Sequence, residues 1–386
     1  MVDETAPVKT PPSDYAIGSY CSSTAWGGLE MNVVRFLGWM RGRGWSTVLY
    51  ARPDSVVSQR ALSAGITVRA VSSPFTYGDP VSAYRLARMI RSDNVGVLLL
   101  HQSRNVILGV VAGLISANRF KLVYCQHMHV GGTKKDVVHA WMHRRLDAWV
   151  TPLPWLAARV LEKTVIPRER IHIIPHGIEL QQFTSERLDK TAARRKLGLP
   201  EGVPLAGIIG RLDPKKGQDT AVRALARVHQ AGHRLHLAVI GDQTLSENTG
   251  YAGHLHELID SLNLRDFVHF RPHQDRPEYA FAAFDMFVLA SRSETYGMVT
   301  IEAFASGLPV IGTSEGGTLD LIMPEQNGLL FPPGDDEALS AAICRYVTDR
   351  EFSARMAARA ENDAIAKYSH VSECEGWERL LATIGL

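Results

Sequence analysis

Two charged segments of the 386-residue chain carry residue types suited to binding a phosphorylated ligand, and the first has the sequence GRLDPKKG at positions 210–217. Arg211 offers a planar fork of N–H donors, and Lys216 adds a compact positive charge. A helix that begins after Gly217 would present free N–H groups at its positive end. The segment therefore predicts a phosphate site, and a solvated basic loop is the alternative.

The second segment, positions 290–299, contains the first of two glutamates, Glu294 and Glu302, that lie eight residues apart. Because Gly297 stands between them, we expect Glu294 in a loop and Glu302 on the helix that follows. Carboxylates accept hydrogen bonds from vicinal hydroxyls, so both could hold one polyhydroxylated ligand. The alternative for Glu302 is a surface charge on an early helical turn, where the helix dipole favours acids.

The first half of the chain has two further candidates. Gly27 and Gly28 follow the first predicted strand, where a glycine pair lets the backbone approach a phosphate closely. The segment Gln126-His127-Met128-His129 follows a later strand, so either histidine could face a ligand. An ordinary turn and a purely structural histidine are the respective alternatives.

Short apolar runs alternate with longer amphipathic segments along the whole chain, which is typical of βαβ units and parallel sheets. The predicted strands of the first half are 15–20, 46–51, 95–100, 121–125 and 148–151, and those of the second are 205–209, 235–240, 267–270, 286–289 and 310–312. Intervening helices are predicted at 30–41, 80–91, 153–163 and 218–229. The fold class is therefore α/β, with two doubly wound, Rossmann-like domains. Ligands of such sheets bind at the carboxyl ends of the strands, so two facing domains would share a cleft.

The strand pattern restarts after Pro175, His176 and Gly177, which predicts a hinge there. We expect one domain at 14–177 and a second at 178–367, with a C-terminal helix at about 368–386 packing back on the first. The acidic, proline-rich segment from Met1 to Pro12 predicts a loose tail.

Composition excludes several classes of protein. With 45% hydrophobic and 21% charged residues the chain is too apolar to be disordered, and its four scattered cysteines indicate neither disulfides nor a zinc site. The longest apolar stretch, Val106 to Ile115, is shorter than the ~20 residues that span a bilayer. The sequence lacks Asp-x-Asp and Gly-x-Gly-x-x-Gly, so we expect no metal site and no dinucleotide dehydrogenase.

Charge divides unevenly along the chain. Residues 1–177 carry 21 Lys and Arg against 11 Asp and Glu, whereas residues 178–386 carry 21 against 29. The basic half contains a run with Lys134, Lys135, His139, His143, Arg144 and Arg145. If this run is one helix, its bases could meet an anionic membrane while Trp141 and Met142 touch the apolar surface. A solvated helix whose aromatic residue packs into the core is the alternative.

Taken in order, these segments resemble the family 4 (group 1) retaining glycosyltransferases of GT-B fold. The resemblance rests on Gly-x-x-Gly-Arg at 207–211, Lys-Gly at 216–217, the glutamates around Tyr296-Gly297, Gly-Leu-Pro-Val at 307–310 and the glycine pair at 316–317. It covers about residues 15–386 and is strongest from 206 to 333. Each motif alone is common, whereas their ordered combination is specific.

The resemblance implies that residues 14–177 form the acceptor-side domain and residues 178–367 the nucleotide-sugar-binding domain. It also implies a role for each candidate residue. Arg211 and Lys216 would bind the diphosphate of a nucleotide sugar, Glu294 would hold the sugar hydroxyls, and Glu302 would hold the ribose. His127, with His129 as the alternative, would touch the sugar near the reacting carbon. The remaining implied contacts come from the acceptor-side glycines Gly27 and Gly28, and from the donor-side loop of Tyr296, Gly297, Met298 and Val299.

The resemblance therefore predicts a retaining, metal-independent hexosyltransferase that uses a UDP- or GDP-linked sugar and a hydroxyl acceptor in cell-surface glycan or glycolipid assembly. The sugar nucleotide is a substrate, so no cofactor is expected. The acceptor would be a glycan, a lipid-linked molecule or a small molecule, with no nucleic acid partner. We expect a cytoplasmic protein, with peripheral contact at the inner face of the membrane.

Two alternatives to a glycosyltransferase remain open. One is a GT-B nucleotide-sugar 2-epimerase or hydrolase, which needs no second substrate. The other is a non-enzymatic protein that binds a sugar nucleotide or a glycan, and the presence of all four donor-binding candidates argues against it.

Overall fold

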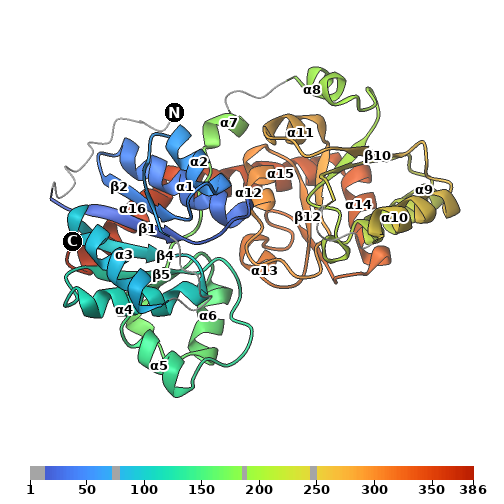
Figure 1. The fold of residues 1–386 in the computed structure, drawn as a ribbon. Helices are drawn as coiled ribbons and strands as arrows, with labels where there is room; N and C mark the ends of the chain where they lie inside the picture. Colours follow the sequence, from blue (N-terminus) through green and yellow to red (C-terminus); the bar gives the residue numbers. More distant parts are fainter. Residues whose placement is uncertain (1–13, 72–78, 185–188, 244–249) are drawn as a thin grey trace. The chain divides into compact units, whose positions relative to one another are not determined.

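The computed structural model describes residues 14–71, 79–184, 189–243 and 250–386 (Figure 1). The chain divides into two compact units, of which unit 1 comprises Met1–His176 with His370–Leu386 and unit 2 comprises Gly177–Ser369. The returning segment adds one arginine and three glutamates to unit 1, so the net charge of this part falls from +10 to +8. The predicted loose tail, Met1 to Pro12, lies outside the described residues.

Unit 1 is built on a seven-stranded parallel sheet. Across the sheet its strands are β3 (Thr67–Ala70), β2 (Ser46–Ala51), β1 (Ala16–Cys21), β4 (Val95–Leu100), β5 (Lys121–Cys125), β6 (Ala148–Thr151) and β7 (Ile171–Ile173). The central strands β1 and β4 are buried along their whole length, as expected where helices cover both faces. The edge strands β3 and β7 were not predicted, because they are short and partly exposed and lack a continuous apolar run.

Seven α-helices of unit 1 fall within its described residues. They are α1 (Gly28–Gly42), α2 (Val56–Ser63), α3 (Pro80–Ser92), α4 (Val106–Ile115), α5 (Val137–His143), α6 (Pro154–Lys163) and α16 (His370–Thr383). Local sequence sets their starts: before α3, Asp79 Oδ1 accepts from the Ser82 N–H at 2.8 Å, and Pro80 occupies the first turn. The long apolar stretch forms α4, and among the described residues no helix is long and apolar enough to cross a membrane.

The C-terminal helix α16 belongs to the core of unit 1. Cys374, Trp377 and Leu381 of this helix are buried in one cluster with Ile17 of β1 and Leu37 of α1. In Figure 1 the red ribbon of α16 lies among the blue elements of the same unit. Burial of such side chains stabilises the folded state by about 1.5–3 kcal/mol each, so the last helix is an integral part of unit 1.

Unit 2 is built on a six-stranded parallel sheet. Across the sheet its strands are β10 (Val268–Arg271), β9 (His236–Ile240), β8 (Leu205–Ile209), β11 (Met286–Leu289), β12 (Val310–Thr313) and β13 (Leu329–Phe331). Its α-helices are α7 (Leu180–Thr184), α8 (Lys190–Leu197), α9 (Gln218–Gln230), α10 (Tyr251–Ser261), α11 (Glu278–Ala283), α12 (Met298–Ala305), α13 (Thr318–Leu321), α14 (Asp336–Thr348) and α15 (Arg350–Lys367).

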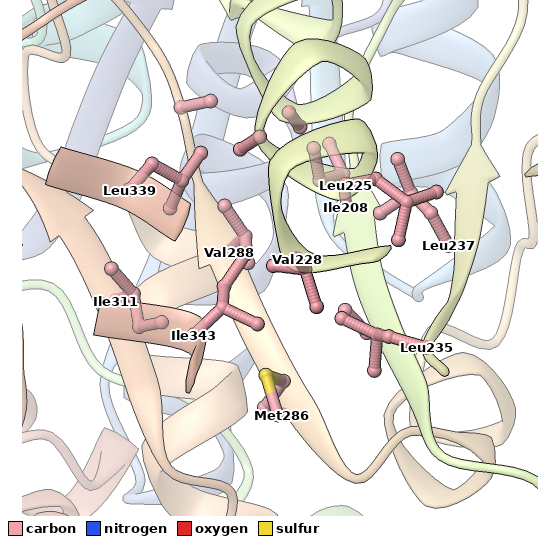
Figure 2. Packing of buried hydrophobic residues seen from close by; sticks show 14 of the residues in the cluster. Ile208, Leu225, Val228, Leu235, Leu237, Met286, Val288, Ile311, Leu339 and Ile343 are labelled. Carbon is pink, nitrogen blue, oxygen red and sulfur yellow. The ribbon is translucent and has the colours of Figure 1, made fainter. Parts of the chain in front are cut away.

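One apolar core holds α9 and α14 against the sheet of unit 2. Figure 2 shows Leu225 and Val228 of α9 beside Leu339 and Ile343 of α14, all packed on strand residues such as Val288. These five side chains are at most 3% exposed. The packing fixes the helix that follows β8, and therefore the loop that joins strand and helix.

In each sheet the order in which successive strands are added reverses at one point. β1 pairs with β2 on one side and β4 on the other, and β8 pairs in the same way with β9 and β11. The predicted α/β class with two doubly wound parallel sheets is confirmed. Ligands of such sheets bind outside the carboxyl ends of the strands where this order reverses. The candidate binding loops are therefore those after β1, β4, β8 and β11.

Candidate functional site

The loop after β8 is shaped by one glycine, Gly217, and one aspartate, Asp213. Gly217 has a φ of +68° and begins α9, and a Cβ at this position would lie 2.1 Å from the carbonyl oxygen of Ala290. The Asp213 side chain accepts from the Lys215 N–H at 2.8 Å and starts the short 3₁₀ turn Pro214–Lys216. Only glycine permits this close approach of two backbones, which brings the loops after β8 and β11 together.

The loop after β11 places the two glutamates at different levels. Glu294 lies in the loop, Gly297 adopts a φ of +86° at the start of α12, and Glu302 is buried on that helix. The predicted split of the pair between loop and helix is confirmed. Tyr296 is also buried, at 6% exposure.

The two loops meet through an ion pair. Lys216 Nζ lies 2.8 Å from Glu294 Oε2, and both side chains are half-buried. The loops are joined again where the Arg292 N–H donates to the Lys215 carbonyl at 2.8 Å and the Arg292 guanidinium contacts Asp219 at 3.3 Å. The structure thus brings the predicted lysine and the first predicted glutamate together at the reversal point of the sheet.

Arg211 lies in the same loop but faces outward. Its side chain is 59% exposed, and its guanidinium is 3.9 Å from the Asp213 carboxylate. The Gln218 amide donates to the Arg211 carbonyl at 2.8 Å and holds the backbone there. The guanidinium is therefore accessible to a ligand that docks on the loop.

A third loop, after β12, contacts the backbone of Glu294. The Gly317 N–H donates to the Glu294 carbonyl at 2.9 Å, and a Cβ on Gly316 would lie 2.4 Å from the same oxygen. The sequence motif included this glycine pair without assigning it a role. Its role in the structure is to let the loop after β12 approach the backbone of Glu294.

The site combines groups that suit a phosphorylated, polyhydroxylated ligand. Lys216 supplies a positive charge, and Glu294 supplies hydrogen-bond acceptors. The helices α9 and α12 begin at Gly217 and Gly297 without a side-chain cap, so their first turns include N–H groups that a ligand could bind. Met298 and Val299, both half-buried, form the first turn of α12, where the sequence predicted amides near the ligand.

The glycine pair of unit 1 is arranged differently. Gly28 begins α1, and the Glu30 side chain accepts from the Gly27 N–H at 3.0 Å. Glu30 is buried, and its carboxylate already accepts the hydrogen bond of the Gly27 N–H, which was predicted to bind a phosphate. A Cβ on Gly28 would meet no atom within 4 Å, which leaves its surroundings open.

The structure distinguishes the two histidines after β5. His129 is exposed, whereas His127 is half-buried, with Nε2 3.0 Å from His101 Nδ1 and its ring stacked on His176 at a centroid distance of 5.3 Å. Burial, followed by the nearby His101 and His176, lowers the pKa of His127 well below its ordinary value. His101, which the sequence analysis missed, lies directly after β4, and burial with a smaller effect of His176 lowers its pKa to about 3. Both rings are therefore neutral near pH 7.

The basic run after residue 133 does not form the single helix considered from the sequence. Lys134 and Lys135 precede α5, and Met142 and His143 are buried, because the far side of this short helix packs on the core. Trp141 is half-buried against the same core, and the Arg145 guanidinium lies over its ring. The structure therefore supports the alternative in which the aromatic residue packs on the core, and burial removes Met142 from a membrane contact. The exposed apolar residues of α5 are Val137 and Val138, at 85% and 57%.

Metal ligands were not expected from the sequence. Within the part of the chain that the structure describes, no group of three or more His, Cys, Asp or Glu side chains is placed to hold a metal ion.

Two Rossmann-like units with a cationic loop at a sheet reversal define an α/β protein of GT-B fold, and the comparisons agree. The model of Glycosyltransferase Family 4 matches residues 26–182, and that of Glycosyl transferases group 1 matches residues 189–363. The chain belongs to this family of group 1, family 4 glycosyltransferases.

The curated proteins that this chain resembles include named glycosyltransferases. A D-inositol 3-phosphate glycosyltransferase of Stackebrandtia nassauensis is 34% identical over 59% of this chain and 52% of its own length. A GDP-mannose-dependent alpha-mannosyltransferase of Mycobacterium tuberculosis is 29% identical over 86% of this chain and 87% of its own length. The chain thus spans about half of the first relative and most of the second.

Solved structures share the fold. A glycosyltransferase of Rickettsia africae superposes with a TM-score of 0.86 at 18% identity, covering 96% of this chain and 98% of its own. Anabaena Alr3699/HepE in complex with UDP superposes with a TM-score of 0.85 at 21% identity, covering 95% of this chain and all of its own. At these identities the likeness establishes the fold.

Proposed function

We propose that the chain is a retaining glycosyltransferase that moves a hexose from a UDP- or GDP-linked sugar to a hydroxyl acceptor. The contact of 2.8 Å between Lys216 Nζ and Glu294 Oε2 is the observation that carries the proposal. It puts a cation suited to diphosphate beside an acceptor suited to sugar hydroxyls. The names of the relatives, one of which is GDP-mannose-dependent, and the UDP in the Anabaena structure support a sugar nucleotide as donor.

In the proposed reaction the acceptor oxygen attacks the anomeric carbon on the face from which the diphosphate departs. The bond from carbon to the diphosphate oxygen breaks, the new glycosidic bond forms, and the departing oxygen takes the acceptor proton. Arg211, Lys216 and the N–H groups at the starts of α9 and α12 stabilise the charge that grows on the diphosphate. Glu294 orients the sugar by accepting from its hydroxyls, and His127 contacts the same sugar. No metal ion is required in this scheme.

A nucleotide panel followed by a transfer assay tests the function. The preferred diphosphate should raise the melting temperature, because a ligand at 100 times its Kd stabilises the folded state by about 2.7 kcal/mol. Transfer from the matching sugar nucleotide should persist in EDTA, with retention at the anomeric carbon. Loss of transfer in EDTA with recovery on adding Mg²⁺ would contradict metal independence. Quantitative release of epimer or free sugar from the donor alone would favour an epimerase or hydrolase.

The two glutamates should respond differently to replacement by glutamine. Glu294→Gln should lower kcat about 10- to 100-fold, because a charge-assisted hydrogen bond that orients the reacting sugar is worth about 1.5–3 kcal/mol. Glu302→Gln should chiefly raise the donor KM, because contacts to the ribose change little between the bound state and the transition state. Steady-state kinetics with varied donor concentration measures both effects.

Glu315 offers a matched control for this pair. It is an exposed glutamate in the loop after β12, so Glu315→Gln removes one carboxylate without touching the ion pair. Its kinetics should equal those of the unchanged protein. Equal, small effects of all three substitutions would contradict the proposal that Glu294 and Glu302 bind the donor.

We also propose that the basic unit 1 meets a lipid-linked or glycan acceptor at the anionic, cytoplasmic face of a membrane. Its net charge of +8, the exposed Val137 and Val138 at the start of α5, and the exposed Arg144 and Arg145 that follow this helix support the proposal. Each cation near an anionic surface contributes about 1 kcal/mol, so attachment should be weak and sensitive to salt.

Co-sedimentation with vesicles tests the membrane contact. The protein should sediment with anionic but not with neutral vesicles at low salt, and changing Lys134, Lys135, Arg144 and Arg145 together to glutamate should abolish this. The control is the same reversal at Arg85, Arg88, Arg91 and Arg119, which are exposed elsewhere on unit 1. Equal loss with both quadruple variants would contradict a local contact at α5, and sedimentation with neutral vesicles would contradict the electrostatic basis.

A further inference from the structure

A row of polar side chains crosses the carboxyl edge of the sheet of unit 1. Ser19 Oγ on β1 lies 2.7 Å from His101 Nε2, and His101 Nδ1 lies 3.0 Å from His127 Nε2. Beyond His127, the ring of His176 stacks on it at an interplanar angle of 8°, and His176 Nδ1 lies 3.2 Å from a carboxylate oxygen of Glu373. The paired strands β1 and β4 therefore place Ser19 and His101 in line with His127, while His176 and Glu373 of α16 lie on the side of its ring face.

The row holds His127 in two directions. The hydrogen bond from His101 fixes one edge of the ring, and the stack on His176 fixes one face. In turn, Glu373 of α16, which is buried, anchors His176. A side chain with two rotatable torsions is thereby restricted to one orientation. Among the described residues, His127 Nδ1 has no hydrogen-bond partner, so this atom is available to a ligand.

The hydroxyl of Ser19 decides where the protons of the two rings lie. Ser19 is 0% exposed, and its hydroxyl has His101 Nε2 as its one side-chain partner among the described residues. If the hydroxyl accepted from His101, its own hydrogen would be buried without an acceptor, which is costly. Ser19 therefore donates to His101 Nε2. A neutral ring that accepts at Nε2 carries its proton on Nδ1.

The order continues to the next ring. With its proton on Nδ1, His101 donates to His127 Nε2, so the neutral His127 carries its own proton on Nδ1. Burial keeps both rings neutral, as described above, so this order holds across the neutral pH range. His127 then presents an N–H donor at Nδ1, for which the described part of the chain supplies no hydrogen-bond partner.

We propose that Ser19 and His101 are positioning residues that fix the orientation and the tautomer of His127, so that Nδ1–H donates to an oxygen of the bound sugar. The role in transfer rests on the proposed function, whereas the tautomer is a property of the protein alone. An imidazole with the opposite tautomer would present a lone pair to that oxygen. A hydroxyl oxygen could still donate to that lone pair, but a ring or glycosidic oxygen could not.

Nitrogen NMR of histidine-labelled protein tests the tautomer without any substrate. The His127 signals, assigned by their loss in His127→Gln, should show a protonated Nδ1 and an unprotonated Nε2. In Ser19→Ala the hydroxyl that sets the order is gone, so His127 should lose its single tautomer. A protonated Nε2 in the unchanged protein, or an unchanged tautomer in Ser19→Ala, would overturn the proposal whether or not the protein transfers sugar.

Kinetics tests the consequence for transfer. His101→Phe keeps a ring of similar size and removes both nitrogens, and it should lower kcat about 100-fold, as misplacement of a contact group by about 1 Å does. The affinity for nucleoside diphosphate should stay unchanged. His143→Phe is the control, because His143 is also a histidine of unit 1 at 5% exposure and its Nδ1 has no partner among the described residues. This variant should retain kcat.

The outcomes separate the two proposals. An equal loss of kcat in His101→Phe and His143→Phe would reduce His101 to a packing role and overturn the positioning proposal. If the unchanged protein transfers no sugar from any nucleotide, the proposed function fails, and the NMR result still decides the tautomer.

Discussion

Lys216→Ala should weaken the binding of the preferred nucleoside diphosphate about 10- to 100-fold, because a charge-assisted hydrogen bond to phosphate is worth about 1.5–3 kcal/mol. The ammonium group of Lys216 is held at the site by its 2.8 Å contact with Glu294, so it does not have to be ordered when the ligand arrives. Isothermal titration with the diphosphate measures the change.

Lys215 is a matched control for this variant. It is exposed in the same 3₁₀ turn, and its backbone, rather than its ammonium group, makes the contacts described above. Lys215→Ala removes the same charge and should change the affinity by less than about threefold, the effect of a screened surface charge. Equal losses in the two variants would mean that the loop acts only through its net charge, and no loss in either would contradict the donor site.

The effect on binding should be separable from an effect on folding. Partly exposed ion pairs contribute about 0–1 kcal/mol to stability, so Lys216→Ala should melt within a few degrees of the unchanged protein. A large fall in melting temperature would assign Lys216 a structural role instead.

Burial explains which parts of the fold could be predicted from the sequence. Strands such as β4 and β11 are buried on both faces, so each appears in the sequence as an unbroken apolar run. The edge strands are partly exposed, and each has a polar residue inside it, Arg69 in β3 and His172 in β7. No continuous apolar run therefore marks either strand in the sequence. Their pairing depends on neighbours that are distant in the sequence.

The same reasoning applies to the site. Lys216, Glu294 and Gly297 could be predicted because each lies in a loop directly after a strand, where the order of motifs is informative. Ser19 and His101 are 82 residues apart, and only the pairing of β1 with β4 brings them together. One signal could have pointed to His101: it is a polar residue placed directly after a wholly apolar strand, in the position that His127 almost occupies after β5.

The sequence left two interpretations of the segment around α5 open for a physical reason. Spacing alone could not decide whether Met142 and His143 face outward, and the helix has only seven residues and begins after both lysines. Its inner side contacts the core of unit 1, where His143 packs edge-on against Trp149. A short basic run cannot show from its sequence which side faces the core.

Gly217→Ala should destabilise the protein by more than about 3 kcal/mol, the range of changes that force a backbone or core to shift. An alanine at a φ of +68° costs about 1–2 kcal/mol by itself. In addition, the new Cβ would lie 2.1 Å from the carbonyl oxygen of Ala290, which follows β11 directly and is buried. That oxygen belongs to the backbone and cannot rotate away, so one of the two loops must move. Urea unfolding measures the loss.

Gly250→Ala separates the collision from the backbone conformation. Gly250 is the N-cap residue of α10 with a φ of +67°, as Gly217 is of α9, but a Cβ there would meet no atom of the described residues within 4 Å. This variant should lose only the conformational cost of about 1–2 kcal/mol. Movement of the loop in Gly217→Ala should also pull Lys216 away from Glu294, so this variant alone should bind the diphosphate at least tenfold more weakly at a temperature where it remains folded. If the two alanine variants lose equal stability and both keep their affinity, the close approach of the loops after β8 and β11 does not determine the geometry of the site.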